Sequence, residues 1–271
     1  MIDSRTEIRA GQRFAFGANW RAFIDTVDET KIQIAADSLV RALRRADLVG
    51  LSFLDVGCGS GLFSLAAHHL GAAVRSFDFD AESVAATAEL RARFAPDASW
   101  PIEQGSILDE EYVARLGRHD IVYSWGVLHH TGDLWRAVGL AAGLVRPGGL
   151  LFVSVYNDQG LRSRLWQRVK RRYNRSGRVA RAAIVLASAG YLWRWRPLLR
   201  LISWSRGGQQ PRARGMSARH DLVDWVGGYP FEVARPEAVF DFLRARGFEL
   251  RHLKTCAGGL GCNEYVFLAP S

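Results

Sequence analysis

The sequence is poor in cysteine and lysine and contains no long apolar run. Only three of its 271 residues are cysteines, Cys58, Cys256 and Cys262, and none forms a CxxC pair or a metal-ligand pattern with histidine. We therefore expect neither disulfides nor a bound metal. The longest weakly charged run, residues 182–193, is far shorter than the roughly 20 residues of a membrane-spanning helix, and no secretory signal is visible. These absences favour a soluble, cytoplasmic protein.

The positive charge is concentrated in one part of the chain. Arginine supplies most of it, because only Lys31, Lys170 and Lys254 are lysines. Residues 157–225 contain sixteen Lys or Arg and three Asp or Glu, a net of +13, whereas the whole chain carries +9, so the remainder is acidic at −4. A localised basic patch indicates an anionic partner, RNA or a membrane surface. A solvated arginine-rich surface explains it equally well.

From Leu51 onward, strand-like and helix-like segments alternate. The expected strands are 51–56, 73–78, 101–104, 120–125, 150–156, 248–255 and 264–268. The expected helices are 62–70, 81–94, 134–145 and 236–246. Pro147-Gly148-Gly149 stops the third of these helices, because proline and glycine break regular structure. This alternation implies an α/β fold with a parallel sheet covered on both faces.

Four parts of the chain are expected. Residues 1–47 form a helical N-terminal leader or lid, and residues 48–156 form the core of the sheet. The alternation stops over residues 157–229, where an insertion rich in arginine and tryptophan, with helical segments, follows the fifth strand. Residues 230–271 return to regular structure and complete the sheet.

A glycine-rich turn joins the first strand to the first helix. Its spacing is GxGxG, with Gly57, Gly59 and Gly61, whereas dinucleotide-binding turns use GxGxxG. Asp55 precedes the first glycine and suits a ligand's ammonium group better than a pyrophosphate. Asp78 ends the second strand, where a carboxylate can accept hydrogen bonds from both hydroxyls of a ribose. The turn lies at the strand ends, where open parallel sheets bind ligands.

Four motifs together resemble those of class I S-adenosylmethionine (SAM) dependent methyltransferases. They are LDVGCGSG at 54–61, the acidic strand end Asp78, VLHHTGD at 127–133 and LVRPGGLLF at 144–152. The nearest group resembles the ubiquinone-biosynthesis O-methyltransferases, and the match covers about 51–156 and more weakly 236–268. The resemblance implies a Rossmann-like, seven-stranded, mostly parallel sheet with helices on both faces, the N-terminal helical leader and a helical insertion after the fifth strand.

The resemblance also implies SAM as cofactor and assigns its binding residues by position. The methionine end would contact Asp55, Gly57, Cys58, Gly59 and Gly61, and Asp78 would hold the ribose. Phe79 offers an apolar face to the adenine, Ser106 and Ile107 would flank it, and Trp125 and Gly126 would line the floor near the sulfonium. Asn19 and Trp20, in an unusually aromatic stretch of the leader, are expected to close over the cofactor.

Three residues are candidates for catalysis at the acceptor end. His129 and His130 follow the fourth strand, and Tyr156 ends the fifth. Histidine is the usual base for a hydroxyl acceptor, but adjacent residues on a turn diverge, so at most one histidine should face the acceptor. The family's motif often has an acidic residue where His129 stands, which weakens its claim. Both histidines could instead shape the site or form hydrogen bonds.

The chemistry expected is methyl transfer from SAM to an oxygen, or less readily a nitrogen, of a small-molecule acceptor, releasing S-adenosylhomocysteine (SAH). The basic insertion would then cap the acceptor with its aromatic residues, Trp166, Tyr173, Tyr191, Trp193, Trp195 and Trp204. Three alternatives stay open. The protein could methylate RNA such as tRNA through the insertion, act on a lipid-linked or quinone acceptor at a membrane surface, or bind a partner without catalysis.

Overall fold

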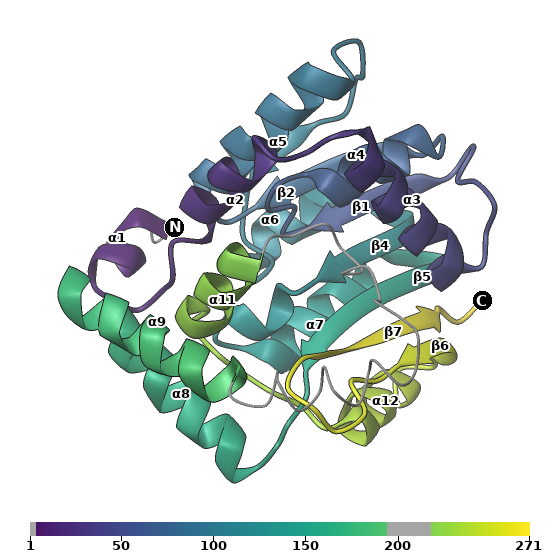
Figure 1. Ribbon diagram of the computed structural model, residues 1–271. Helices are drawn as coiled ribbons and strands as arrows, with labels where there is room; N and C mark the ends of the chain where they lie inside the picture. Colours follow the sequence, from purple (N-terminus) through teal and green to yellow (C-terminus); the bar gives the residue numbers. More distant parts are fainter. Residues whose placement is uncertain (1–3, 194–217) are drawn as a thin grey trace, which may run out of the picture.

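The computed structural model describes residues 4–193 and 218–271, and its centre is a seven-stranded sheet (Figure 1). Its strands are β1 (Ser52–Val56), β2 (Ala73–Asp78), β3 (Ile102–Gln104), β4 (His119–Trp125), β5 (Val145–Tyr156), β6 (Glu249–Lys254) and β7 (Cys262–Leu268). The strand order is β3-β2-β1-β4-β5-β7-β6. All neighbouring pairs are parallel except those of β7, which runs antiparallel to both β5 and β6. The expected fold class is confirmed.

Two apolar cores hold helices on opposite faces of the sheet. Successive strand residues point to alternate faces, so in β4 Ile121 and Tyr123 enter one core while Val122 enters the other. The first core packs under α3 (Glu29–Leu43), α4 (Leu62–His69) and α5 (Ala81–Phe94). The second packs under α6 (Glu110–Leu116), α7 (Leu134–Gly143) and α12 (Pro236–Arg244).

Two local predictions were wrong. The Pro147-Gly148-Gly149 segment does not separate a helix from a strand, because α7 already ends at Gly143 and β5 begins at Val145. Val145 pairs with His119, and the register shifts before pairing resumes at Ile121, so the segment forms an irregularity inside the strand.

The other error is helix α6, which the alternation pattern did not predict. The Asp109 carboxylate caps it by accepting from the Tyr112 backbone N–H at 3.1 Å, and Tyr112, Val113 and Leu116 are buried. Seven residues are too few to show a helical period, although an N-cap aspartate followed by two glutamates is a usable signal.

A third apolar cluster lies beside the sheet (Figure 1). There α8 (Leu161–Asn174), α9 (Arg178–Trp193) and α11 (Ala218–Gly227) gather next to α1 (Ser4–Arg9). Phe14, just ahead of α2 (Phe16–Ile24), packs into this cluster with Trp166 and Val226. The leader and the insertion, far apart in the sequence, therefore meet at one end of the sheet. Trp195 and Trp204 lie outside the described residues, as does the Trp193 side chain.

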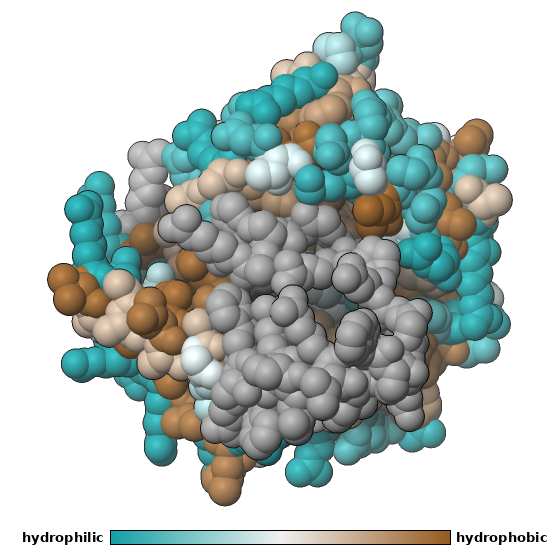
Figure 2. Space-filling view, viewed as in Figure 1, coloured by the Kyte–Doolittle hydropathy of each residue, from teal (hydrophilic) through white to brown (hydrophobic). Residues whose placement is uncertain are grey.

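The surface is mainly polar, with apolar patches over the insertion helices (Figure 2). The most exposed apolar side chains there are Leu161, Leu165, Val179 and Leu186. No helix within residues 4–193 and 218–271 combines the length and the apolar character needed to cross a membrane.

Candidate active site

The glycine turn after β1 is held against the end of β2 by its backbone. Both Gly57 and Cys58 donate from their backbone N–H to the Phe77 carbonyl, at 2.9 and 3.1 Å. Gly57 has φ +80°, and a Cβ there would lie 2.3 Å from a methyl of Val127. Only glycine accepts both the left-handed backbone and this close approach. The turn therefore packs its bare backbone against Val127, and both residues line the cavity.

Two buried carboxylates flank the turn. Asp55 is 2% exposed and accepts a hydrogen bond from Ser64 Oγ at 2.6 Å. Burial raises the pKa of Asp55 to about 7, and the charge of Asp78 adds to this rise while the Ser64 bond opposes it. Asp78 accepts from the Gly59 backbone N–H at 3.0 Å and from the Asp80 backbone N–H at 2.9 Å. Burial likewise raises the pKa of Asp78 to about 6.

A single cavity of about 670 Å³ begins at these groups and extends past the ends of β4 and β5. Most of the expected site residues line it, namely Trp20, Asp55, Gly57, Cys58, Gly59, Asp78, Phe79, Ser106, Ile107, Trp125, Gly126, His130 and Tyr156. Three others do not. Gly61 faces α5, where a Cβ would meet Thr87 at 2.7 Å, and neither Asn19 nor His129 belongs to the cavity wall.

The N-terminal leader forms one wall of the cavity. Trp20 lies over the glycine turn, since a Cβ on Gly59 would be 3.0 Å from its indole Nε1. The Gly17 backbone N–H donates to Asp80 Oδ2 at 3.0 Å, and Arg21 forms an exposed ion pair with Glu82 at 3.0 Å. These contacts join α2 to the start of α5 and hold the wall in place.

Arg13 is a site residue that sequence reasoning missed. Its guanidinium lies 4.7 Å from the Phe79 ring centroid, donates to the His130 carbonyl at 2.9 Å and pairs with Glu7 at 2.6 Å. Its positive charge also lowers the pKa of Asp78 against the larger effect of burial. Arg13 thus connects the end of the cavity beside Asp78 and Phe79 to the end beside His130. Nothing local in the sequence marks it as a cavity residue, because Phe79 and His130, its contacts at the cavity, lie more than 60 residues away.

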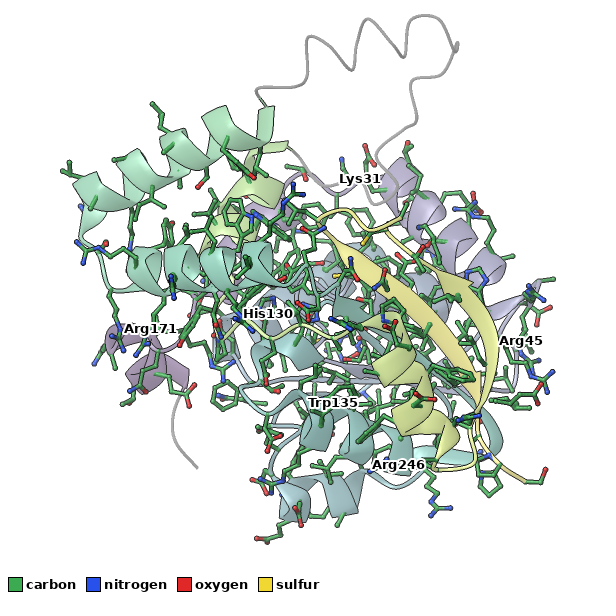
Figure 3. All side chains as sticks on the ribbon, turned by 90° about the horizontal axis from the view of Figure 1, so that it is seen from below. Lys31, Arg45, His130, Trp135, Arg171 and Arg246 are labelled. Atoms are coloured by element: carbon green, nitrogen blue, oxygen red, sulfur yellow. The ribbon has the colours of Figure 1, made fainter. Side chains whose placement is uncertain are left out.

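The two adjacent histidines have different surroundings. His130 lies inside the molecule between α8 and the sheet (Figure 3) and lines the cavity, and its Nδ1 is 2.6 Å from the Pro230 carbonyl. Because a carbonyl only accepts, Nδ1 carries the proton and Nε2 keeps its lone pair. Burial lowers the pKa of His130 to about 3, and the charges of Lys170 and Arg13 lower it further against the Pro230 bond. His130 is therefore neutral at physiological pH.

His129 lies behind this wall and is fully buried. Its ring packs 4.0 Å from the Tyr156 ring centroid, and burial, with nearby His130 and Lys170, lowers its pKa well below the usual value. Lys170 is also fully buried, donates to the Trp225 carbonyl and lies 4.6 Å from the Phe231 ring centroid. These two residues support Tyr156 and Trp225, which line the cavity.

Trp125, at the end of β4 on the cavity floor, is held by Glu264 of strand β7. Its indole Nε1 donates to Glu264 Oε1 at 3.1 Å, across the small side chain of Ser154 on the intervening strand β5. Ser154 Oγ in turn accepts from the Gly126 backbone N–H at 2.8 Å. The last part of the wall comes from Leu192, Trp225, Leu260 in the β6–β7 turn, and Cys262 at the start of β7.

The donor set of the cavity fits a ligand with an amino-acid end and a sugar diol. Gly57 and Gly59 line the cavity, and the lack of a Cβ lets Val127 and Trp20 pack directly against the turn. Each oxygen of Asp78 accepts one backbone bond, and a carboxylate oxygen accepts about two, so capacity remains for two hydroxyls. Asp55 provides a buried negative charge for an ammonium group.

Comparison with known proteins gives consistent matches. A family model described as a methyltransferase domain matches residues 28–196. The ubiquinone biosynthesis O-methyltransferase of Methylobacterium sp. (strain 4-46) is 33% identical over 110 residues, 41% of this chain and 43% of that protein. The enzyme of the same name from Rhodopseudomonas palustris (strain HaA2) is 29% identical over 177 residues, 63% of this chain and 60% of that protein. The match spans less than two thirds of either relative.

Solved structures show the same fold at low identity. Magnesium protoporphyrin IX methyltransferase from Synechocystis PCC 6803, with bound SAM, superposes with a TM-score of 0.56 at 14% identity, covering 99% of this chain and 98% of that one. An O-methyltransferase family protein from Burkholderia thailandensis superposes with a TM-score of 0.55 at 13% identity, covering 93% of this chain and 60% of that one.

Proposed function

The chain belongs to the methyltransferase-domain family, the class I methyltransferases that use SAM, and from this premise we propose that it methylates an oxygen of a small-molecule acceptor, releasing SAH. The observation that carries the proposal is the continuity of one cavity. It runs from the carboxylates Asp55 and Asp78 at one end to the neutral His130 and Tyr156 at the other.

We assign the cofactor's binding groups as follows. Asp78 accepts hydrogen bonds from the two ribose hydroxyls, and Asp55 pairs with the ammonium of the methionine end. Gly57 and Gly59 lie against the methionine part of the cofactor. When bound, SAM supplies an electrophilic methyl on a sulfonium. Trp20 and Arg13 close the leader wall over this end and exclude water, which strengthens each charged contact inside.

The residues at the acceptor end support the proposed methylation of an oxygen. His130 Nε2 is an unprotonated acceptor, so it can orient a hydroxyl and take up its proton as the new carbon–oxygen bond forms. With a pKa of about 3, His130 is too weak to ionise a hydroxyl in advance. We therefore assign it the positioning of the hydroxyl and late proton transfer, with Tyr156 beside it, and assign His129 a supporting role behind the wall.

The four parts of the chain fit this scheme. We propose that residues 1–47 act as lid, 48–156 as SAM-binding core, 157–229 as acceptor cap and 230–271 as completion of the sheet. Phe14, Leu192 and Trp225 give the acceptor compartment apolar walls from both the leader and the cap. A small apolar or aromatic acceptor suits such walls. The comparisons favour neither RNA methylation nor a role without catalysis, and cytoplasmic location stays a prediction.

The test uses methyl-tritiated SAM with size-matched acceptors, catechol and 1,2-diaminobenzene. We expect label on the catechol oxygen, lost in His130→Ala while SAH affinity is kept. The matched control is His252→Ala, on strand β6 away from the cavity. Label recovered only on the diamine would overturn the assignment to oxygen. Equal turnover in the His130 variant would overturn the role of that histidine.

A further inference from the structure

Helix α9 exposes an apolar stripe on the surface. Val179 and Leu186 are 86% and 77% exposed, which is unusual for large aliphatic side chains. Ala182, Ala183, Ala187 and Gly190 are exposed as well. These positions recur at the helical spacing of three and four residues, so they form one stripe along the helix. From residue 182 to 193 the helix contains no charged residue.

The neighbouring helix α8 exposes mainly positive charge. Its exposed residues include Arg162, Arg164, Arg168, Arg171 and Arg172. Leu161 and Leu165, 78% and 57% exposed, lie among them. Residues 161–193 contain nine Lys or Arg and no Asp or Glu. Figure 2 shows apolar and hydrophilic patches alternating over this part of the molecule.

Helices α8 and α9 lie next to each other. Both α8 and α9 pack against α11 and against each other, so their exposed faces point away from α11 (Figure 1). Trp166 of α8 and Val185 of α9 belong to the apolar cluster beneath them. Arg171 lies at the outer side of the molecule, far from the interior position of His130 (Figure 3). We call this combined face, from Leu161 to Gly190, the α8–α9 surface.

We propose that the α8–α9 surface docks on an anionic lipid surface, with the α9 stripe at the acyl boundary and the α8 arginines at the headgroups. A helix that lies in the membrane interface combines an apolar face with basic residues, and anionic lipids attract each nearby arginine. An RNA partner would need arginines and stacking aromatics, but it would not use exposed Val179 and Leu186. Leu192, near the end of α9, lines the cavity, so docking places one cavity wall beside the lipid.

The test is sedimentation of the full chain with phosphatidylglycerol vesicles and, separately, with phosphatidylcholine vesicles. We expect binding to phosphatidylglycerol alone. Arg164→Gln, Arg168→Gln and Arg172→Gln together should weaken partitioning on the order of 100-fold at low salt. Val179→Gln with Leu186→Gln should weaken it roughly tenfold or more. All five side chains are exposed, so both variants should keep the wild-type circular dichroism and thermal midpoint.

A matched control removes the same charge elsewhere. Arg41→Gln, Arg45→Gln and Arg118→Gln, all exposed and outside the insertion, should leave vesicle binding within about threefold. An equal loss in this control would refute the surface assignment, because only net charge would then matter. Absence of phosphatidylglycerol binding, or binding unchanged in both test variants, would also overturn the proposal.

Two further outcomes identify other occupants. Salt-sensitive binding of single-stranded polyuridylate, without binding to vesicles, would replace the lipid by RNA. A concentration-dependent dimer that Val179→Gln with Leu186→Gln dissociates, again without vesicle binding, would replace it by a second copy of this chain. Vesicle binding is measured without turnover, so failure here leaves the methyl-transfer proposal standing.

Discussion

Binding of SAH should weaken steeply as the pH falls from 8 to 5, because the cofactor end needs two ionised carboxylates. The pKa of Asp55 is raised to about 7 and that of Asp78 to about 6, in both cases mainly by burial. A ligand that binds only the ionised forms loses affinity as the pH falls through these values. Treating the two groups as independent gives an affinity about 1000-fold lower at pH 5 than at pH 8, about 4 kcal/mol.

A truncated ligand separates the two carboxylates. Methylthioadenosine keeps the ribose but lacks the ammonium, so it should depend on Asp78 alone and weaken only about tenfold over the same range. Calorimetric titration of both ligands at several pH values measures the two curves. In Asp55→Asn, the affinity for SAH should change with pH only as much as the affinity for methylthioadenosine does. Asp97→Asn, at an exposed position, should leave the pH dependence of both affinities unchanged. Equal slopes for the two ligands would refute the assignment of Asp55 to the ammonium.

Asp55→Asn should also stabilise the protein in the absence of ligand. A carboxylate whose pKa is raised on folding favours the folded state when protonated, and this contribution disappears as the pH rises through about 7. At pH 8 the ionised Asp55 therefore opposes folding, and Asp55→Asn should raise the unfolding free energy by about 2–4 kcal/mol. Urea unfolding at pH 8 and pH 5 measures this. A gain that does not shrink at pH 5 would contradict the electrostatic explanation.

Three further substitutions test the cavity walls. Gly57→Ala should lower the thermal midpoint and the SAH affinity, because the new Cβ would clash with Val127 and the backbone has a positive φ. Adding Val127→Ala removes the clash but not the backbone strain, so it should restore only part of both losses. Full restoration would show that backbone strain is unimportant. Trp20→Ala should weaken SAH by about tenfold and Trp20→Phe much less, since an aromatic cover is lost; unchanged calorimetry would remove it from the lid. Tyr156→Phe should lower kcat in the tritium assay and leave SAH affinity unchanged. A loss of both kcat and SAH affinity would place Tyr156 at the cofactor end.

The fold and the cavity lining around the glycine turn were largely predictable because their signals are local. Strand β2 and helix α5 have the predicted bounds, since apolar periodicity and the N-cap residue Asp80 define them. The glycine turn lies directly between β1 and α4, and Asp78 is the last residue of β2. The fold was less predictable where short or irregular pieces occur, as in α6 and at Pro147 in β5.

The acceptor end was less predictable because it is assembled from distant segments. Arg13 contacts the carbonyl of a residue 117 positions later, and Glu264 holds Trp125 from 139 positions away. No local pattern encodes such pairs. Distinguishing His130 from its neighbour also required the fold, since both rings contact Tyr156 but His130 alone of the two lines the cavity.

The central claim is that two buried carboxylates beside a glycine turn hold an adenosyl amino acid. Calorimetric titration of the full chain with SAM at pH 8 tests it most directly, with Asp78→Ala and NAD⁺ as comparisons. We predict one SAM bound per chain, no measurable binding in the variant, and no heat with NAD⁺. Heat from NAD⁺ in place of SAM, or SAM affinity unchanged by Asp78→Ala, would contradict the account.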